Sequence, residues 1–160
     1  MKKQEYTASE LRICIDDIKE KGIQGRIYGI AVEKRNVFSC SSELLVMIDR
    51  LLDGIGKPQS SRKKRSFRDS AEETAHSYCV FPRSYHSSEE IREKHGKIMT
   101  RDVFFLSRLR SSWQGVMKDD QGKLLGQFDS ELEFIDLLYD CGVTGGNYTT
   151  LGSVHHRKDE

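Results

Sequence analysis

The chain has 160 residues, of which 36% are hydrophobic, and its 26 Lys and Arg residues against 25 Asp and Glu give a formal net charge of +1. This length allows one domain with a core of its own, without disulfides or a structural metal. The near-neutral charge excludes a chain-wide attraction to nucleic acid or to an acidic membrane surface, so such a function would have to rest on a local cluster.

The cysteines and the first residues indicate the compartment. Cys14, Cys40, Cys79 and Cys141 are widely spaced and form no CxxC pair, and no apolar leader follows Met1. No apolar run approaches the roughly 18 residues that span a bilayer. We therefore expect a soluble protein of the reducing cytoplasm, with free thiols and no membrane partner.

The first segment predicts a helix over residues 8–21. Thr7-Ala8-Ser9-Glu10 has the S/T-x-x-E form of a capping box, and Gly22 is placed to end the helix. The apolar residues that follow the box share a helical spacing: Leu11, Cys14, Ile15 and Ile18. The alternation of Leu11, Ile13 and Ile15 also permits a strand, so both alternatives stay open.

Residues 23–32 are rich in β-formers and, with Val37 and Phe38 beyond a polar turn, predict a hairpin or a bulged strand. A serine-rich start then predicts a helix over residues 42–53, ended by Gly54. Its apolar face, which we expect in the core, comprises Leu44, Met47, Ile48 and Leu51.

Residues 54–100 predict a polar, basic connection with few regular elements. A short helix over 69–78 and an extended piece over 78–82 are indicated within it. Ser87 and Glu90 form a second capping box, which predicts a short, exposed helix near residues 88–95.

The second half gives the clearest pattern. Residues 100–109 have apolar side chains on both faces, which predicts a central strand. Residues 113–117 and 123–128 bracket a turn at 119–122 and predict a hairpin. Ser130 and Glu133 form a third capping box before a helix over 131–141, and residues 144–160 show no periodicity, which indicates a flexible tail.

These elements predict a single α+β domain over residues 1–143. Its small, mainly antiparallel sheet is packed by helices near residues 8–21, 42–53 and 131–141, with the basic connection at about 54–100 at its periphery. We expect four residues to lie in the sheet: Ile27, Phe105, Trp113 and Met117.

The two halves also invite superposition as strand–strand–helix units. Gln24-Gly25 and Gln114-Gly115, Phe38 and Phe128, and Glu43 and Glu133 are all 90 positions apart. Four identities over some forty positions is close to what unrelated sequences give, and the upstream segments are predicted to differ, helical in one half and extended in the other. A duplication and a similar local architecture without common origin are both open.

Trp113-Gln114-Gly115 is followed at a fixed spacing by Phe128-x-Ser130-x-x-Glu133. This spacing is the most specific part of a resemblance to a family of small Clostridia-type proteins of uncharacterised function. Residues 108–111 depart from the usual Arg-Gln-Asn approach to the tryptophan. The resemblance implies no activity, but it implies that the basic stretch is a recurrent feature. Its other motifs are Gly25-Arg26-Ile27-Tyr28, Phe38 with Glu43-Leu44, Asp53, Pro58-Gln59, Arg65-Ser66-Phe67 and Ser112.

The sequence contains no recognisable catalytic pattern. There is no Gly-x-Ser-x-Gly motif, and Gly54-Ile55-Gly56-Lys57 lacks the first glycine and the Ser or Thr of a phosphate-binding loop. His76, Cys79 and His86 form too small a set to indicate a zinc site. We therefore expect no enzymatic activity, no metal and no cofactor.

Two features are candidate binding sites. The basic run could contact phosphates or an acidic partner while Phe67 stacks on a base, although a solvated linker is the simpler interpretation. Trp113 is expected to cover one end of the core, but an exposed Trp113 between Arg108 and Arg110 would be a binding hot spot. The basic candidates are Arg62, Lys63, Lys64, Arg65, Phe67 and Arg68.

We therefore expect a non-catalytic intracellular binding or regulatory module with a protein partner. The sequence specifies neither the identity of that partner nor the oligomeric state. The alternative is a nucleic-acid-binding protein that uses the basic residues 62–68.

Overall fold

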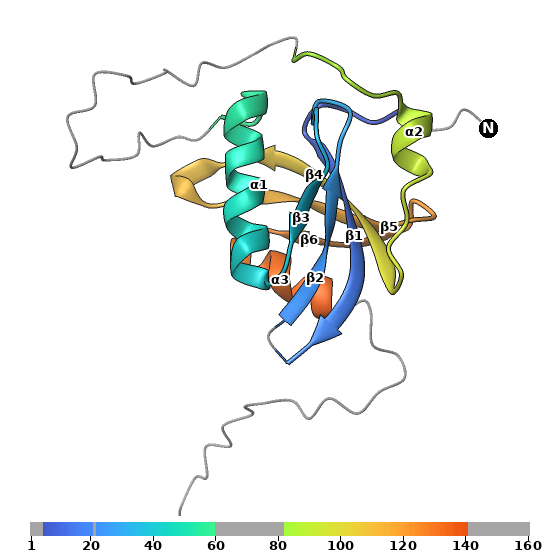
Figure 1. Ribbon diagram of the computed structural model, residues 1–160. Helices are drawn as coiled ribbons and strands as arrows, with labels where there is room; N and C mark the ends of the chain where they lie inside the picture. The colour runs from blue at the N-terminus through green and yellow to red at the C-terminus, as the bar shows by residue number, and fades with distance from the viewer. Residues whose placement is uncertain (1–4, 21, 60–81, 141–160) are drawn as a thin grey trace, which may run out of the picture.

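A computed structural model of the chain describes residues 5–20, 22–59 and 82–140. Within these residues six antiparallel strands form one sheet in the order β3-β2-β1-β4-β5-β6 (Figure 1). The strands are β1 Glu10–Lys19, β2 Gly22–Tyr28, β3 Asn36–Phe38, β4 Met99–Ser107, β5 Gln114–Asp119 and β6 Leu124–Phe128. The helices are α1 Ser41–Ile55, α2 Ser88–Arg92 and α3 Glu131–Asp140, with a short 3₁₀ turn, η1, at Leu109–Ser111. The α+β class with a small antiparallel sheet and three helices is confirmed.

The helix predicted over residues 8–21 is wrong, because this segment is strand β1. Its helix-like capping box makes only one turn: the Glu10 amide donates to the Thr7 carbonyl at 3.1 Å, and the chain then extends. Residues 10–15 are all buried, since β1 is central and packed on both faces. Ile13 and Ile15, which are β-branched, suit that position, and the alternating pattern was the informative one.

Other predicted elements are confirmed with shifted ends. Helix α1 continues through Gly54 and ends at Ile55, where Gly56 adopts a left-handed φ of 77° and donates its amide to the Leu52 carbonyl. Strand β4 is central, as predicted, but stops at Ser107, so Leu109 lies in η1. The hairpin of β5 and β6 follows the predicted turn.

The capping box of Ser87 is confirmed, because its Oγ accepts a hydrogen bond from the Glu90 amide, and the short helix there is α2. The helix predicted over 69–78, most of the extended piece predicted over 78–82, and the tail predicted over 144–160 lie outside the described residues.

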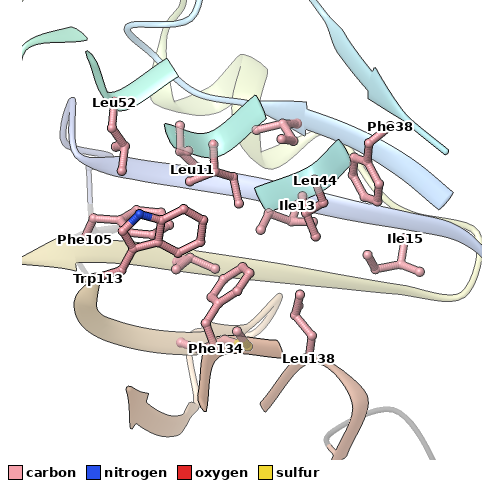
Figure 2. Packing of buried hydrophobic residues seen from close by; sticks show 14 of the residues in the cluster. Leu11, Ile13, Ile15, Phe38, Leu44, Leu52, Phe105, Trp113, Phe134 and Leu138 are labelled. Atoms are coloured by element: carbon pink, nitrogen blue, oxygen red, sulfur yellow. The ribbon is translucent and has the colours of Figure 1, made fainter. Parts of the chain in front are cut away.

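The main core lies between one face of the sheet and the helices α1 and α3 (Figure 2). Ile27, Phe105 and Met117 lie in strands of the sheet, as predicted, whereas Trp113 immediately precedes β5, and all four belong to this core. Helix α2 lies against the other face, away from α1 and α3 (Figure 1), where Ile91 is buried and the Ser88 hydroxyl accepts from the Tyr6 amide. The sheet is therefore covered by two helices on one face and, in part, by α2 and the chain before β1 on the other.

The two halves have the same architecture, with three strands and a helix in each. Most of the described pairings within the first half recur 90 positions later, although those of Ile18 with Ile23 and of Lys19 with Gly22 do not. Gly25 pairs with Phe38 as Gly115 pairs with Phe128, and Ile13 pairs with Ile27 as Val103 pairs with Met117. The similarity suggested by four identities is thus confirmed, and it extends to β1 and β4, where the sequence patterns had disagreed.

The correspondence includes irregular features. The register shifts at Asp16 in β1 and at Leu106 in β4, again 90 positions apart. Strands β1 and β4 pair with Arg12 opposite Asp102. These two residues are each other's counterparts, so a pseudo-twofold axis passes between them at the centre of the sheet.

Candidate functional site

The predicted basic site lies outside the described residues, so the structure gives no position for Arg62, Lys63, Lys64, Arg65, Phe67 or Arg68. It does describe the chain just before them. The carbonyl of Pro58 accepts a hydrogen bond of 2.7 Å from Nε of Arg108, which fixes this point of the chain against the β4 end of the sheet.

Trp113 is a core residue in the structure, with only 3% of its surface exposed. Its ring packs edge-on against Phe105 at 5.5 Å and against Phe134 at 5.4 Å between centroids, and Phe128 completes the cluster. Edge-to-face contacts of this kind stabilise a core beyond the area that they bury. The core interpretation of Trp113 describes this structure, and the exposed hot spot does not.

Arg108, which the sequence placed beside Trp113, is buried as well. Its guanidinium donates to Asp49 at 3.1 Å and to Asp53 at 2.8 Å, both on α1, in addition to the Pro58 carbonyl. Bonds between ionised partners are stronger than neutral ones, and burial keeps water from screening them. Arg108 thereby fastens the end of β4 to α1 across the two halves of the chain.

A glutamine side chain holds the loop that follows. Oε1 of Gln114 accepts from Ser107 Oγ at 2.7 Å and from the Leu109 amide at 2.8 Å. Its Nε2 donates weakly to the carbonyls of Leu109 and Asp129, at 3.4 and 3.5 Å. The loop is therefore fixed to the junction between β6 and α3.

Two further features restrain the conformation of this loop. Ser112 Oγ lies 3.1 Å from both the Asp129 carbonyl and a carboxylate oxygen of Glu131, at the start of α3. Arg110 has a φ of 53°, in the left-handed region that non-glycine residues rarely adopt. Such a conformation persists only when the surrounding contacts enforce it, and it is frequent at functional sites.

Large apolar side chains project from this fixed frame. Leu106 is 58% exposed, Leu109 60% and Leu132 78%. We refer to the region formed by residues 106–114, 129–132 and the Arg108 partners Asp49 and Asp53 as the Arg108 end. Figure 2 shows the core beneath it, where Leu52, Phe105, Trp113 and Phe134 meet.

Single exposed leucines are ordinary on protein surfaces. The pseudo-symmetry allows Leu106, Leu109 and Leu132 to be compared with the residues at the same places in the first half. At the corresponding positions, 90 residues earlier, the first half carries Asp16, Lys19 and Ser42. The same fold in the same chain thus tolerates polar residues at all three places, so packing does not require leucine there.

The frame is also specific to the second half. Ile18 is the counterpart of Arg108, and Tyr139 is the counterpart of Asp49. At the first-half end, Ser41 and Tyr139 join the helices through a hydroxyl pair at 3.0 Å where the Arg108 end uses buried charge. The two ends therefore differ both in the polar contacts that join sheet and helices and in the exposed side chains.

A second polar cluster lies on the other face of the sheet, at the pseudo-twofold axis. Arg12 donates to the Tyr6 hydroxyl at 2.6 Å, Tyr6 donates to Asp102 at 3.0 Å, and the Arg12 and Asp102 charges are 3.7 Å apart. Burial raises the pKa of Asp102, which Arg12 opposes, and burial also raises the pKa of Glu10 nearby. These groups are tied to one another beneath α2 and the chain before β1, so we regard the cluster as structural.

Other chemically active side chains are engaged or enclosed. Burial raises the pKa of the Cys14 thiol to about 11, which suppresses its nucleophilic form. Asp16 accepts two hydrogen bonds from Arg26, which lower the pKa of that carboxyl. In the ranges 5–20, 22–59 and 82–140, no three His, Cys, Asp or Glu side chains are grouped to hold a metal ion. His76 and Cys79 fall outside those ranges.

Comparisons with protein-family models, with curated proteins and with solved structures gave no match. In the part of the chain that the structure describes, no helix has both the length and the apolar character needed to cross a membrane.

Proposed function

We propose that the protein is a non-catalytic binding module that recognises a protein partner through the Arg108 end. The observation that carries the proposal is the exposure of Leu109 and Leu132 on a hydrogen-bonded frame, at positions where the matching half of the chain is polar. A rigid frame lowers the entropy lost on binding, so exposed apolar side chains on it are favourable anchors for a partner.

The buried charge of Arg108 supports this assignment. It holds α1, β4 and the chain at Pro58 in one arrangement without occupying the surface. The loop that carries Leu109 and the start of α3 that carries Leu132 are joined by the hydrogen bonds of Ser112 and Gln114.

Site-specific photocross-linking in the cells that produce the protein tests this function. A benzophenone side chain is placed at position 109, at position 132, or, as the control, at Leu124, which is 54% exposed but lies at the opposite end of β6. We expect one discrete protein adduct from positions 109 and 132 and none from position 124. Equal labelling from all three positions would remove the proposal, and adducts with RNA or DNA would favour the nucleic-acid alternative.

A further inference from the structure

The exposed leucine of α3 is surrounded by acidic side chains. Glu131 and Glu133 flank Leu132 in the sequence, and Asp136 lies one helical turn later on the same exposed side. No Lys or Arg of the described ranges forms an ion pair with Glu133 or Asp136. An apolar anchor with a negative surround is thus offered to solvent.

The whole helical layer has the same charge. Arg50 is the one basic residue within α1 and α3. Of their acidic residues, Asp49 and Asp53 are paired with Arg108. The others are Glu43, Glu131, Glu133, Asp136 and Asp140. A polyanion approaching this layer would be repelled, whereas a cationic segment would be attracted.

Carboxylates of this helical layer already bind one guanidinium within the molecule, that of Arg108. Asp49 and Asp53, on successive turns of α1, each take one of its nitrogens at 3.1 and 2.8 Å. Side chains of this helix therefore already bind a cation in the folded chain, with geometry suited to arginine.

From this complementarity we infer that the partner contributes a cationic amphipathic segment. Its apolar side chains pack on Leu109 and Leu132, and its Lys or Arg side chains lie toward Glu133 and Asp136. This inference rests on the proposed function, since it names the chemistry of the partner at the same surface. It matches a known mode of recognition, in which apolar anchors provide affinity and surrounding charges provide orientation and selectivity.

Three synthetic amphipathic peptides provide the test. They share one apolar pattern and carry Lys, Gln or Glu at the polar positions. Each is titrated into the full-length, isotope-labelled chain, and amide chemical shifts are recorded. We expect the Lys peptide to shift the amides of residues 109–114 and 129–136 and its affinity to fall as salt rises, while the other two bind at least about tenfold more weakly.

Surface variants locate the effect. We expect Leu132→Ala to weaken the Lys peptide about tenfold at any salt concentration, as for an apolar hot spot. Asp136→Asn should weaken it about two- to fivefold at low salt and less at high salt. Leu124→Ala is the matched control and should leave binding unchanged.

The inference is overturned if the Lys peptide does not bind, if the Gln or Glu peptide binds as tightly, or if the shifts map away from the Arg108 end. Its failure is separable from that of the proposed function. Cross-links from positions 109 and 132 to a partner with a neutral or acidic contact segment would keep the binding module and discard the cationic partner. The absence of such cross-links would discard the binding module itself.

Discussion

Individual residues at the centre of the sheet carry charge where most proteins have apolar side chains. Glu10, Arg12 and Asp102 are all buried. Glu10 accepts a hydrogen bond from the Thr7 amide, and Arg12 donates to the Tyr6 hydroxyl and pairs with Asp102 on the neighbouring strand β4. Buried charges are costly unless they are paired, so these residues should respond measurably to pH and to substitution.

We expect Glu10→Gln to stabilise the protein at neutral pH. Burial raises the pKa of Glu10, so between its unfolded and folded pKa values the folded state holds the proton more tightly, and stability falls as pH rises through that window. Glutamine removes this loss and can still accept from the Thr7 amide. Urea unfolding at pH 7 should show a higher free energy of unfolding for the variant, and the difference should shrink as pH falls toward 4. A variant that is less stable at pH 7 would contradict this interpretation.

The thiols give a second test at this scale. Cys14 is fully buried with a pKa raised to about 11, whereas Cys40 is partly exposed. During brief alkylation of the native protein at pH 8, we expect Cys40 to be modified and Cys14 to stay unmodified until the protein is unfolded. Peptide mass spectrometry measures both sites in one sample. Equal modification of the two in the folded state would show that β1 is not enclosed as described.

Elements of the fold depend on glycines where neighbouring strands of the sheet approach closely. A Cβ at Gly115 would lie 2.3 Å from the Phe104 carbonyl oxygen and 2.6 Å from the Phe128 ring, and one at Gly25 would lie 1.9 Å from the Cys14 carbonyl oxygen. Gly54, within α1, has open space around it.

We therefore expect Gly115→Ala and Gly25→Ala each to destabilise the protein by about 3 kcal/mol or more, because backbone and rings must move. Gly54→Ala is the control and should stabilise α1 by up to about 1 kcal/mol. Thermal and urea unfolding of the three variants provide the comparison. If Gly115→Ala matched Gly54→Ala, the close contact between β5, β4 and β6 would be wrong.

Helix and strand types were predictable from the sequence where local and long-range preferences agree. The capping boxes of Ser87 and Ser130 precede segments that pair with no strand, and both begin helices. The box of Thr7 precedes β-branched residues that pair with β2 and β4, and the pairing prevails over the cap. A single-segment pattern does not contain that information.

The candidate site was less predictable for a related reason. Arg108 is next to Trp113 in the pattern, but its partners Asp49 and Asp53 are more than 50 residues away. The exposure of Leu109 depends on where β4 stops, and the strand prediction extended it too far. The position of Trp113 near Arg108 and Arg110 was the sequence feature that pointed to this loop.

At the scale of the whole molecule, the two halves share the register that duplication of a strand–strand–strand–helix unit would produce. The bulges of β1 and β4 and most of the paired residues share one offset of 90. In a symmetric ancestor formed from two such units, the residue on the axis would face its own copy. Arg12 opposite Asp102 gives that position complementary charges, which favours pairing of the two different halves.

This interpretation leads to a charge-exchange experiment. We expect Arg12→Asp and Asp102→Arg alone each to lower the free energy of unfolding by about 3–5 kcal/mol, because each leaves like charges buried together. The double variant should recover at least half of the loss, since the Tyr6 hydroxyl can donate to one partner and accept from the other in either arrangement. A double variant as unstable as the sum of the two single variants would show that the axis pair has no such role.

The central claim, that the Arg108 end is a binding surface, is tested most directly by quantitative affinity isolation with two matched double variants. Leu109→Ala with Leu132→Ala removes the exposed anchors, and Lys19→Ala with Ser42→Ala alters the corresponding positions of the first half. We expect both variants to be folded, the first to lose at least about 90% of the partner that cross-links at position 132, and the second to retain it. Equal recovery of that partner by the two variants would contradict the assignment of function to the second half.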